Sequence, residues 1–237
     1  MEYPVTPFGP DIWLAKGPTV TGAMGFRFPT RMAVIRLPDD GGLWIWSPVE
    51  MTKDLRTAID ELGVVRHLVA PNSLHHMFLA NWAKTYPDAK VHAAPGLSAK
   101  TTGTSIHRTL DDDPNPAWQE TLGQVVIRGN KITSEVVFFH RPSATVLVTD
   151  FIQQLPQGWY TGWRALIARA DLMTAPVPSV PRKFRLATTD KTAARHAVRK
   201  ILEWPADRLV FAHGSPIEVN ARATLENTFR WLQPSRH

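Results

Sequence analysis

Cysteine is absent from this chain of 237 residues. Disulfide bonds and thiolate metal ligands are therefore excluded, so imidazole and carboxylate groups would have to hold any metal ion. Without cysteine, the sequence does not indicate whether the protein occupies an oxidising or a reducing compartment. No stretch approaches the roughly 18 apolar residues of a membrane-spanning helix, and residues 1–10 lack the basic and apolar regions of a signal peptide. We expect a soluble, cytoplasmic protein with no membrane partner.

Several familiar catalytic motifs are also absent. The chain has no glycine-rich phosphate loop, no Gly-x-Ser-x-Gly elbow and no His-Glu-x-x-His helix. Ser215 stands close to His213, but no strand-to-helix elbow surrounds it, and residues this close in a turn point apart. Serine hydrolysis is therefore not expected.

The chain has little excess charge. Lysine and arginine outnumber the acidic residues by 27 to 21, which gives a net charge of +6 at pH 7. The basic residues are dispersed, so no nucleic-acid partner is expected, and only a modest preference for anionic partners follows. Arg141 and the basic stretch 182–185 are the groups that would favour a small anionic substrate.

Apolar residues make up 43% of the chain, which is enough to bury one hydrophobic core. We expect a single domain over residues 1–237. Alternating and apolar runs predict strands, and apolar spacings of three and four predict helices. The order of strands and helices predicts an α/β fold in which two mixed sheets pack face to face with helices outside. The principal predicted strands are 11–15, 33–37, 43–47, 65–70, 90–93, 124–128, 134–139, 145–149 and 209–212, and the helices are 52–62, 77–85, 188–202 and 220–232.

Four histidines and one aspartate follow predicted strands: His75, His76, His140, Asp150 and His213. A lone histidine in such a place is more often a core residue, but chance rarely puts every candidate after a strand. Imidazole with carboxylate is a ligand set that borderline divalent metals prefer. We therefore expect a metal site at one edge of the sheets. The remaining histidines, 67, 92, 107, 196 and 237, are expected to be structural or exposed.

Several short motifs together resemble a known superfamily. They are Arg31-Met32, the segment 43–48 (Leu-Trp-Ile-Trp-Ser-Pro), Ala70-Pro-Asn72, the His75-His76 pair, the spacing from His140 to Asp150, and Ala212-His-Gly214. In this order they resemble the metallo-β-lactamase-like fold, and more specifically an uncharacterised branch described as a domain of unknown function. The resemblance implies a four-layer αββα sandwich with metal at one edge of the two sheets.

The resemblance also implies a ligand set, with a departure from the usual motif. Against the pattern His-x-His-x-Asp-His, this chain has Pro71 and Ser73 in the first two places, His75 in the acidic place and His76 last. His75, His76, Asp150 and His213 are therefore implied to ligate one ion. His140 is left as an extra ligand or as the start of a sparse second site, so a mononuclear site or an unfamiliar binuclear site is expected.

These expectations define a function. We expect a metal-dependent hydrolase of a small, anionic or ester-like substrate, in which the ion lowers the pKa of a bound water toward about 7. Asp150 and His140 are the candidate catalytic residues, and Ser143 and Thr145 are candidates for supporting hydrogen bonds. Zinc is the expected ion, with iron or manganese as alternatives. A non-haem iron redox enzyme and a non-catalytic metal-binding or ligand-binding protein remain alternatives, and efficient hydrolysis of β-lactams is not expected.

Overall fold

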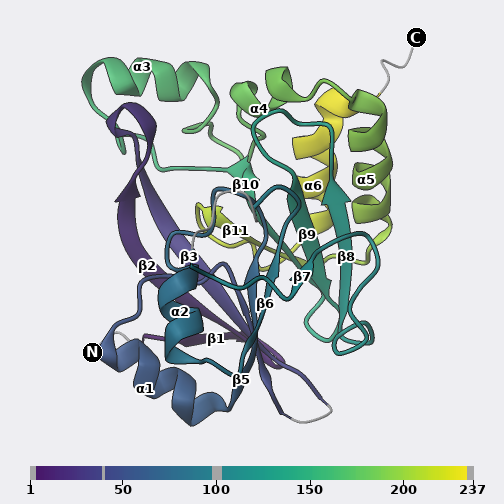
Figure 1. Cartoon of the computed structure of the whole chain (residues 1–237). Helices are drawn as coiled ribbons and strands as arrows, with labels where there is room; N and C mark the ends of the chain where they lie inside the picture. The colour runs from purple at the N-terminus through teal and green to yellow at the C-terminus, as the bar shows by residue number, and fades with distance from the viewer. Residues whose placement is uncertain (1–3, 39–40, 98–102, 234–237) are drawn as a thin grey trace.

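Two β-sheets pack face to face, and helices cover the outer face of each (Figure 1). This arrangement comes from a computed structural model that describes residues 4–38, 41–97 and 103–233. Both sheets mix parallel and antiparallel pairs, as the sequence predicted.

The larger sheet contains seven strands, which lie side by side in the order of the chain. The pairs from β1 to β4 are antiparallel, and those from β4 to β7 are parallel. The strands are β1 (Thr6–Gly9), β2 (Ile12–Thr21), β3 (Arg27–Arg36), β4 (Leu43–Trp46), β5 (Val65–Ala70), β6 (Lys90–Ala93) and β7 (Arg108–Thr109).

The smaller sheet has four strands in the order β11-β10-β9-β8. Strand β10 pairs with β9 in antiparallel orientation and with β11 in parallel orientation, so the carboxyl ends of β10 and β11 lie at the same edge. The strands are β8 (Leu122–Ile127), β9 (Glu135–His140), β10 (Thr145–Gln153) and β11 (Arg208–His213).

Helices α1 and α2 pack on the outer face of the larger sheet, whereas α4, α5 and α6 cover the smaller one. Helix α1 begins after Thr52, whose hydroxyl accepts a hydrogen bond from the Leu55 amide, and ends at Gly63. The helices are α1 (Lys53–Leu62), α2 (Leu79–Thr85), α3 (Gly162–Ala170), α4 (Arg182–Ala187), α5 (Lys191–Glu203) and α6 (Ala221–Phe229), with short 3₁₀ turns at Ala23–Gly25 and Arg230–Leu232.

The core between the two sheets is largely aromatic and aliphatic. Trp44 and Trp46 of β4 face Phe138 of β9, and the rings of Trp44 and Phe138 meet edge to face at 4.9 Å. All three side chains are fully buried. Because each sheet also buries its other face under helices, the observed layers are α, β, β and α, which confirms the predicted fold class.

Two regions near the site differ from the sequence predictions. Strands β2 and β3 form a long hairpin that extends well beyond the predicted residues 11–15 and 33–37. Pro18 and Pro29 lie within these strands, and a register shift between Lys16 and Thr19 accommodates the irregularity. Helices α3 and α4, which were not predicted from the sequence, lie at the same end of the molecule as the tip of this hairpin (Figure 1).

Candidate metal centre

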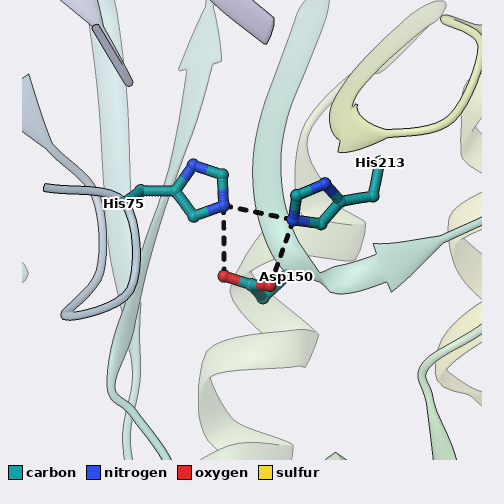
Figure 2. A group of neighbouring side chains, drawn as sticks. All are labelled: His75, Asp150 and His213. Atoms are coloured by element: carbon teal, nitrogen blue, oxygen red, sulfur yellow. Dashed lines mark hydrogen bonds and ion pairs between the residues drawn. The ribbon is translucent and has the colours of Figure 1, made fainter. Parts of the chain in front are cut away.

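Three of the predicted ligands converge at one edge of the sandwich (Figure 2). His75 lies in the turn between β5 and α2, Asp150 lies within β10, and His213 is the last residue of β11. The His75 Nε2 atom lies 3.2 Å from Asp150 Oδ2 and 3.3 Å from His213 Nε2, and the His213 Nε2 atom lies 3.3 Å from Asp150 Oδ1. All three side chains are more than 90% buried.

Asn72 connects two of these residues. Its amide oxygen accepts hydrogen bonds from the backbone amides of Leu74 and His75, at 2.8 and 2.9 Å, which bends the chain after β5 and sets the position of His75. Its amide nitrogen donates to Asp150 Oδ2 at 2.7 Å. One fully buried side chain therefore holds both the His75 turn and the carboxylate.

The larger sheet orients His213. Its Nδ1 atom lies 2.8 Å from the carbonyl oxygen of Pro29, which can only accept, so Nδ1 carries a proton and Nε2 is the atom that faces the cluster and could bind a metal ion. The buried guanidinium of Arg31 donates to the carbonyl oxygens of Phe211 and Gly214 on either side of His213. A Cβ atom at Gly214 would lie 2.1 Å from the Phe211 ring, so this close turn requires glycine.

Ser47 supports His75 from the end of β4. Its hydroxyl lies 2.8 Å from His75 Nδ1, and its backbone has φ of 52°, a left-handed conformation that costs a non-glycine residue free energy. Such strain persists only where surrounding contacts impose it. The Ser47 amide is held by the Val69 carbonyl oxygen at 2.9 Å, so strand β5 contributes to that constraint.

Asp150 of the cluster has a second buried carboxylate, Glu135, as its neighbour, and both accept hydrogen bonds from the Asn72 amide. Burial raises the pKa of Asp150, but the charge of His75 and hydrogen bonds from His213 and His75 outweigh it, so its pKa lies well below the ordinary value. Burial, followed by the charge of Asp150, raises the pKa of Glu135 to about 7. Glu135 accepts hydrogen bonds from the backbone amides of Asp150 and Phe151, at 2.9 and 3.3 Å. Asp150 therefore carries the negative charge of the cluster, while Glu135 fixes the backbone of β10.

The donor set fits a divalent ion. Metal-ligand bonds of about 2.0 to 2.1 Å in tetrahedral geometry separate neighbouring ligand atoms by roughly 3.3 Å, and the measured separations are 3.2 to 3.3 Å. Within the described part of the chain, this is the one group of three or more such residues whose ligand atoms all lie within 4.8 Å of one another.

His76 contributes no ligand atom to this group. Residues 75–78 form a turn that leads into α2, and the Leu79 amide donates to the His76 carbonyl oxygen. In this structure, therefore, the ligand group contains His75 of the pair and not His76.

The prediction that His140 lies at the same edge is wrong. Strands β9 and β10 are antiparallel, and His140 pairs with Thr145 at the start of β10. Asp150 is five residues further along, on the order of 15 Å away at the rise of a β-strand. His140 is fully buried beside Ser143, at 2.7 Å, and burial lowers its pKa to about 4, against a smaller opposing effect of Asp11.

The residues around His140 share its location. The Ser143 hydroxyl lies 2.7 Å from that of Thr145, so both support His140 rather than the cluster. Arg141 lies in the exposed turn between β9 and β10 at this remote edge. These residues therefore form a buried polar contact and its surface turn, away from His75, Asp150 and His213.

The supporting roles of Asn72, Glu135 and Ser47 were not predicted from the sequence, although Asn72 and Ser47 lie within the quoted motifs. Glu135 precedes the apolar run 136–139, and an acidic residue next to a buried strand was the available signal. Asn72 and Ser47 both follow strand ends, as the predicted ligands do. Arg31 belonged to the quoted motifs, but its contacts with β11 needed the tertiary structure.

A cavity of about 750 Å³ opens beside the cluster. His75, Asp150 and His213 line it together with residues from the β2–β3 hairpin, α3 and α4. The cluster is therefore reachable by a molecule of considerable size.

Solved structures with the same fold include several metalloenzymes. A metallo-beta-lactamase from Pontibacter korlensis is 16% identical, with 98% of this chain and 99% of that chain covered and a TM-score of 0.63. The metallo-beta-lactamase FIM-1 from Pseudomonas aeruginosa, in its mono-zinc form, is 12% identical, with 96% and 93% covered and a TM-score of 0.65. The metal-soaked Flv1 flavodiiron core from Synechocystis sp. PCC6803 is 12% identical, with 96% and 60% covered and a TM-score of 0.65. At these identities the likeness shows the fold.

The protein therefore has the metallo-β-lactamase fold. A family model matches residues 19–161, more than half of the chain, and the chain belongs to that family, described as Domain of unknown function (DUF4336). A comparison with curated proteins found no significant match. Among the described residues, no helix has the length and apolar character needed to cross a membrane.

Proposed function

We propose that this protein is a metal-dependent hydrolase in which His75, Asp150 and His213 hold one divalent ion, zinc being the expected one. The observation that carries the proposal is the convergence of their ligand atoms, 3.2 to 3.3 Å apart, on the wall of a large cavity. Three protein ligands leave a further coordination position open, as in catalytic rather than structural zinc sites. An ester-like substrate enters from the cavity.

A divalent ion held by His75, Asp150 and His213 would supply Lewis acidity for polarising a substrate oxygen and for lowering the pKa of water. The chain orients the donors for this role. The Pro29 carbonyl oxygen keeps the proton of His213 on Nδ1, and Ser47 fixes the ring of His75. Asp150 contributes one negative charge, so the site keeps a net positive charge with which to attract an electron-rich oxygen.

Asn72 and Glu135 act on Asp150 rather than on the substrate. The Asn72 amide donates to the Asp150 carboxylate, and Glu135 accepts from backbone amides of β10. Both side chains are fully buried, and neither lines the cavity. Their role is to hold the carboxylate in place, which lowers the cost of reorganisation during the reaction.

The test is turnover by protein stripped with a chelator and then loaded separately with zinc, manganese or iron. The substrates are a carboxylic ester, a lactone, a thioester, a phosphodiester and a chromogenic cephalosporin. We expect metal-restored hydrolysis of at least one acyl substrate, lost in the Asp150→Asn variant, and little turnover of the cephalosporin. The matched control is His107→Gln, a histidine outside the cluster. Activity that survives both chelation and Asp150→Asn would refute the proposal.

A redox function is the second candidate, because two imidazoles with one carboxylate also form the ligand set of non-haem iron enzymes. The likeness to a flavodiiron core is in fold alone. Iron-loaded protein that consumes oxygen in the presence of a reductant, while the zinc form hydrolyses none of the substrates, would favour this alternative.

A further inference from the structure

The cavity beside the metal cluster is walled mainly by apolar side chains. They come from segments far apart in the sequence: the tip of the β2–β3 hairpin, the turn before α2, the end of α3, and α4. Phe28, Phe78, Met173 and Phe184 form part of the wall. Its volume of about 750 Å³ is in the upper part of the range for pockets that enclose small molecules.

The cationic groups of this wall already have partners. The Lys183 Nζ atom lies 3.1 Å from Asp171 Oδ2, and the Arg182 guanidinium donates to the Ala170 carbonyl oxygen at 2.7 Å. Asp171 also lines the cavity, so it offsets the charge of Lys183. The wall therefore lacks the concentration of unpaired positive charge that a small polyanionic substrate would need.

Several wall residues leave large apolar side chains in contact with water. Met24, Met77 and Leu186 are 69%, 61% and 83% exposed, and Ile167 is 43% exposed. These side chains come from four separate segments and all face one cavity. A contiguous exposed apolar surface of this kind is typical of a binding site, because a ligand that covers it removes apolar area from water.

We propose that the substrate is an acyl compound, an ester, thioester or lactone, whose long apolar chain lies in this cavity while its carbonyl group reaches the cluster of His75, Asp150 and His213. The proposal rests on the proposed hydrolase function. In the reaction, the oxygen of water forms a bond to the carbonyl carbon, and the bond to the alkoxy or thiolate group breaks. One water proton passes to the leaving group, which yields an alcohol or thiol, and the other is released as the acid ionises.

Binding of straight-chain carboxylates tests the chain pocket without any turnover. Titration calorimetry of zinc-loaded protein with butanoate, hexanoate, octanoate and decanoate should give a Kd that falls about fourfold for each added methylene, until the chain fills the cavity. The heat-capacity change of binding should become more negative over the same series. A Kd that is independent of chain length would overturn the proposal.

Charged substitutions on the wall provide the second arm. Leu186→Asp and Ile167→Asp replace exposed side chains, so the fold should survive, but a carboxylate in the wall should weaken decanoate binding at least tenfold and leave butanoate little changed. Val64→Asp is the matched control, because Val64 is 59% exposed and lies outside the wall. Equal weakening in all three variants would contradict the assignment of the cavity.

The two proposals fail in different ways. If carboxylates bind with the expected chain dependence but no ester, thioester or lactone is hydrolysed by any metal form, the hydrolase proposal is wrong and the chain pocket stands as a binding site. If acyl substrates are hydrolysed with kcat/KM independent of chain length, the hydrolase stands and the apolar substrate class is overturned. Comparison of the ester, thioester and lactone at equal chain length then identifies the leaving group.

Discussion

Replacement of Asn72 by alanine should weaken metal binding without removing a ligand. The Asn72 side chain makes two kinds of contact: its oxygen accepts from the Leu74 and His75 amides, and its nitrogen donates to Asp150, Glu135 and Thr149. Its loss removes the acceptor that fixes the turn carrying His75, and it removes the amide donor from the Asp150 carboxylate. Both effects enlarge the range of positions that the ligand atoms sample.

The magnitude follows from these contacts. Two backbone amides lose a neutral acceptor, at about 1 kcal/mol each, and a buried carboxylate loses a donor, at about 1.5 to 3 kcal/mol. The variant should therefore lose about 4 kcal/mol of unfolding free energy, and Tm should fall by roughly 10 °C for a chain of this length. Loss of a residue that orients ligands typically lowers metal affinity about 10- to 100-fold.

Asn130→Ala is the matched control. The Asn130 side chain makes the same type of turn, accepting from the Ile132 amide and donating to the Phe184 carbonyl oxygen and the Thr188 hydroxyl, but it contacts no residue of the cluster. It should lose stability and keep its zinc affinity, measured by competition with a chromophoric chelator. Equal zinc affinities in the Asn72→Ala and Asn130→Ala variants would refute the role assigned to Asn72.

Three further predictions concern buried polar groups. Burial, followed by the charge of His67, lowers the pKa of His92 to about 3. The stability that neutral His92 contributes is therefore complete above the unfolded-state pKa of about 6.5 and is lost as the pH falls toward 3. Between pH 8 and pH 5, the unfolding free energy of His92→Phe in denaturant titrations should fall by about 2 kcal/mol less than that of the parent. Glu135→Gln should lower the unfolding free energy by about 1 to 3 kcal/mol in urea titrations, because an NH₂ group would face backbone amides that need an acceptor; a stability equal to that of the parent would contradict this. His140→Ala should lower Tm yet leave bound metal unchanged, and a loss of metal by elemental analysis would restore His140 to the site.

Local patterns predicted the inner strands and the first helix well. Strands β5 and β6 have the predicted ranges 65–70 and 90–93, and α1 begins after the Thr52 cap and ends at Gly63. In the two strands the apolar pattern alone indicates the structure, and in α1 the apolar spacing, the Thr52 cap and the terminal Gly63 all indicate the same helix. The β2–β3 hairpin was underestimated because its prolines obscure an alternating pattern that pairing with neighbouring strands stabilises.

The site was predicted in part, for a geometric reason. Asp150 and His213 come together because the carboxyl ends of the parallel strands β10 and β11 share one edge. His75 follows β5 of the other sheet, and Asn72 joins its turn to Asp150. His140 also follows an apolar run, but β9 runs the opposite way. Strand direction depends on the fold, so position after a strand is not sufficient to assign an edge.

The supporting residues were not predictable from spacing. Asn72 and Glu135 are fully buried polar side chains. Asn72 donates to Asp150 Oδ2, 78 positions away in sequence, and Glu135 accepts from the Asp150 amide, 15 positions away. Their roles arise from contacts across the two sheets. A polar residue inside or next to a predicted buried strand indicates a buried hydrogen bond, because buried polar groups are nearly always paired.

Metal content of the parent and five variants tests the central claim most directly. The variants are His75→Ala, Asp150→Ala, His213→Ala, His76→Ala and His140→Ala, each dialysed against zinc, desalted and measured by elemental analysis. We predict one zinc ion per chain in the parent, loss in the first three variants, and retention in His76→Ala and His140→Ala. Full occupancy in His75→Ala and His213→Ala, in folded protein, would contradict it.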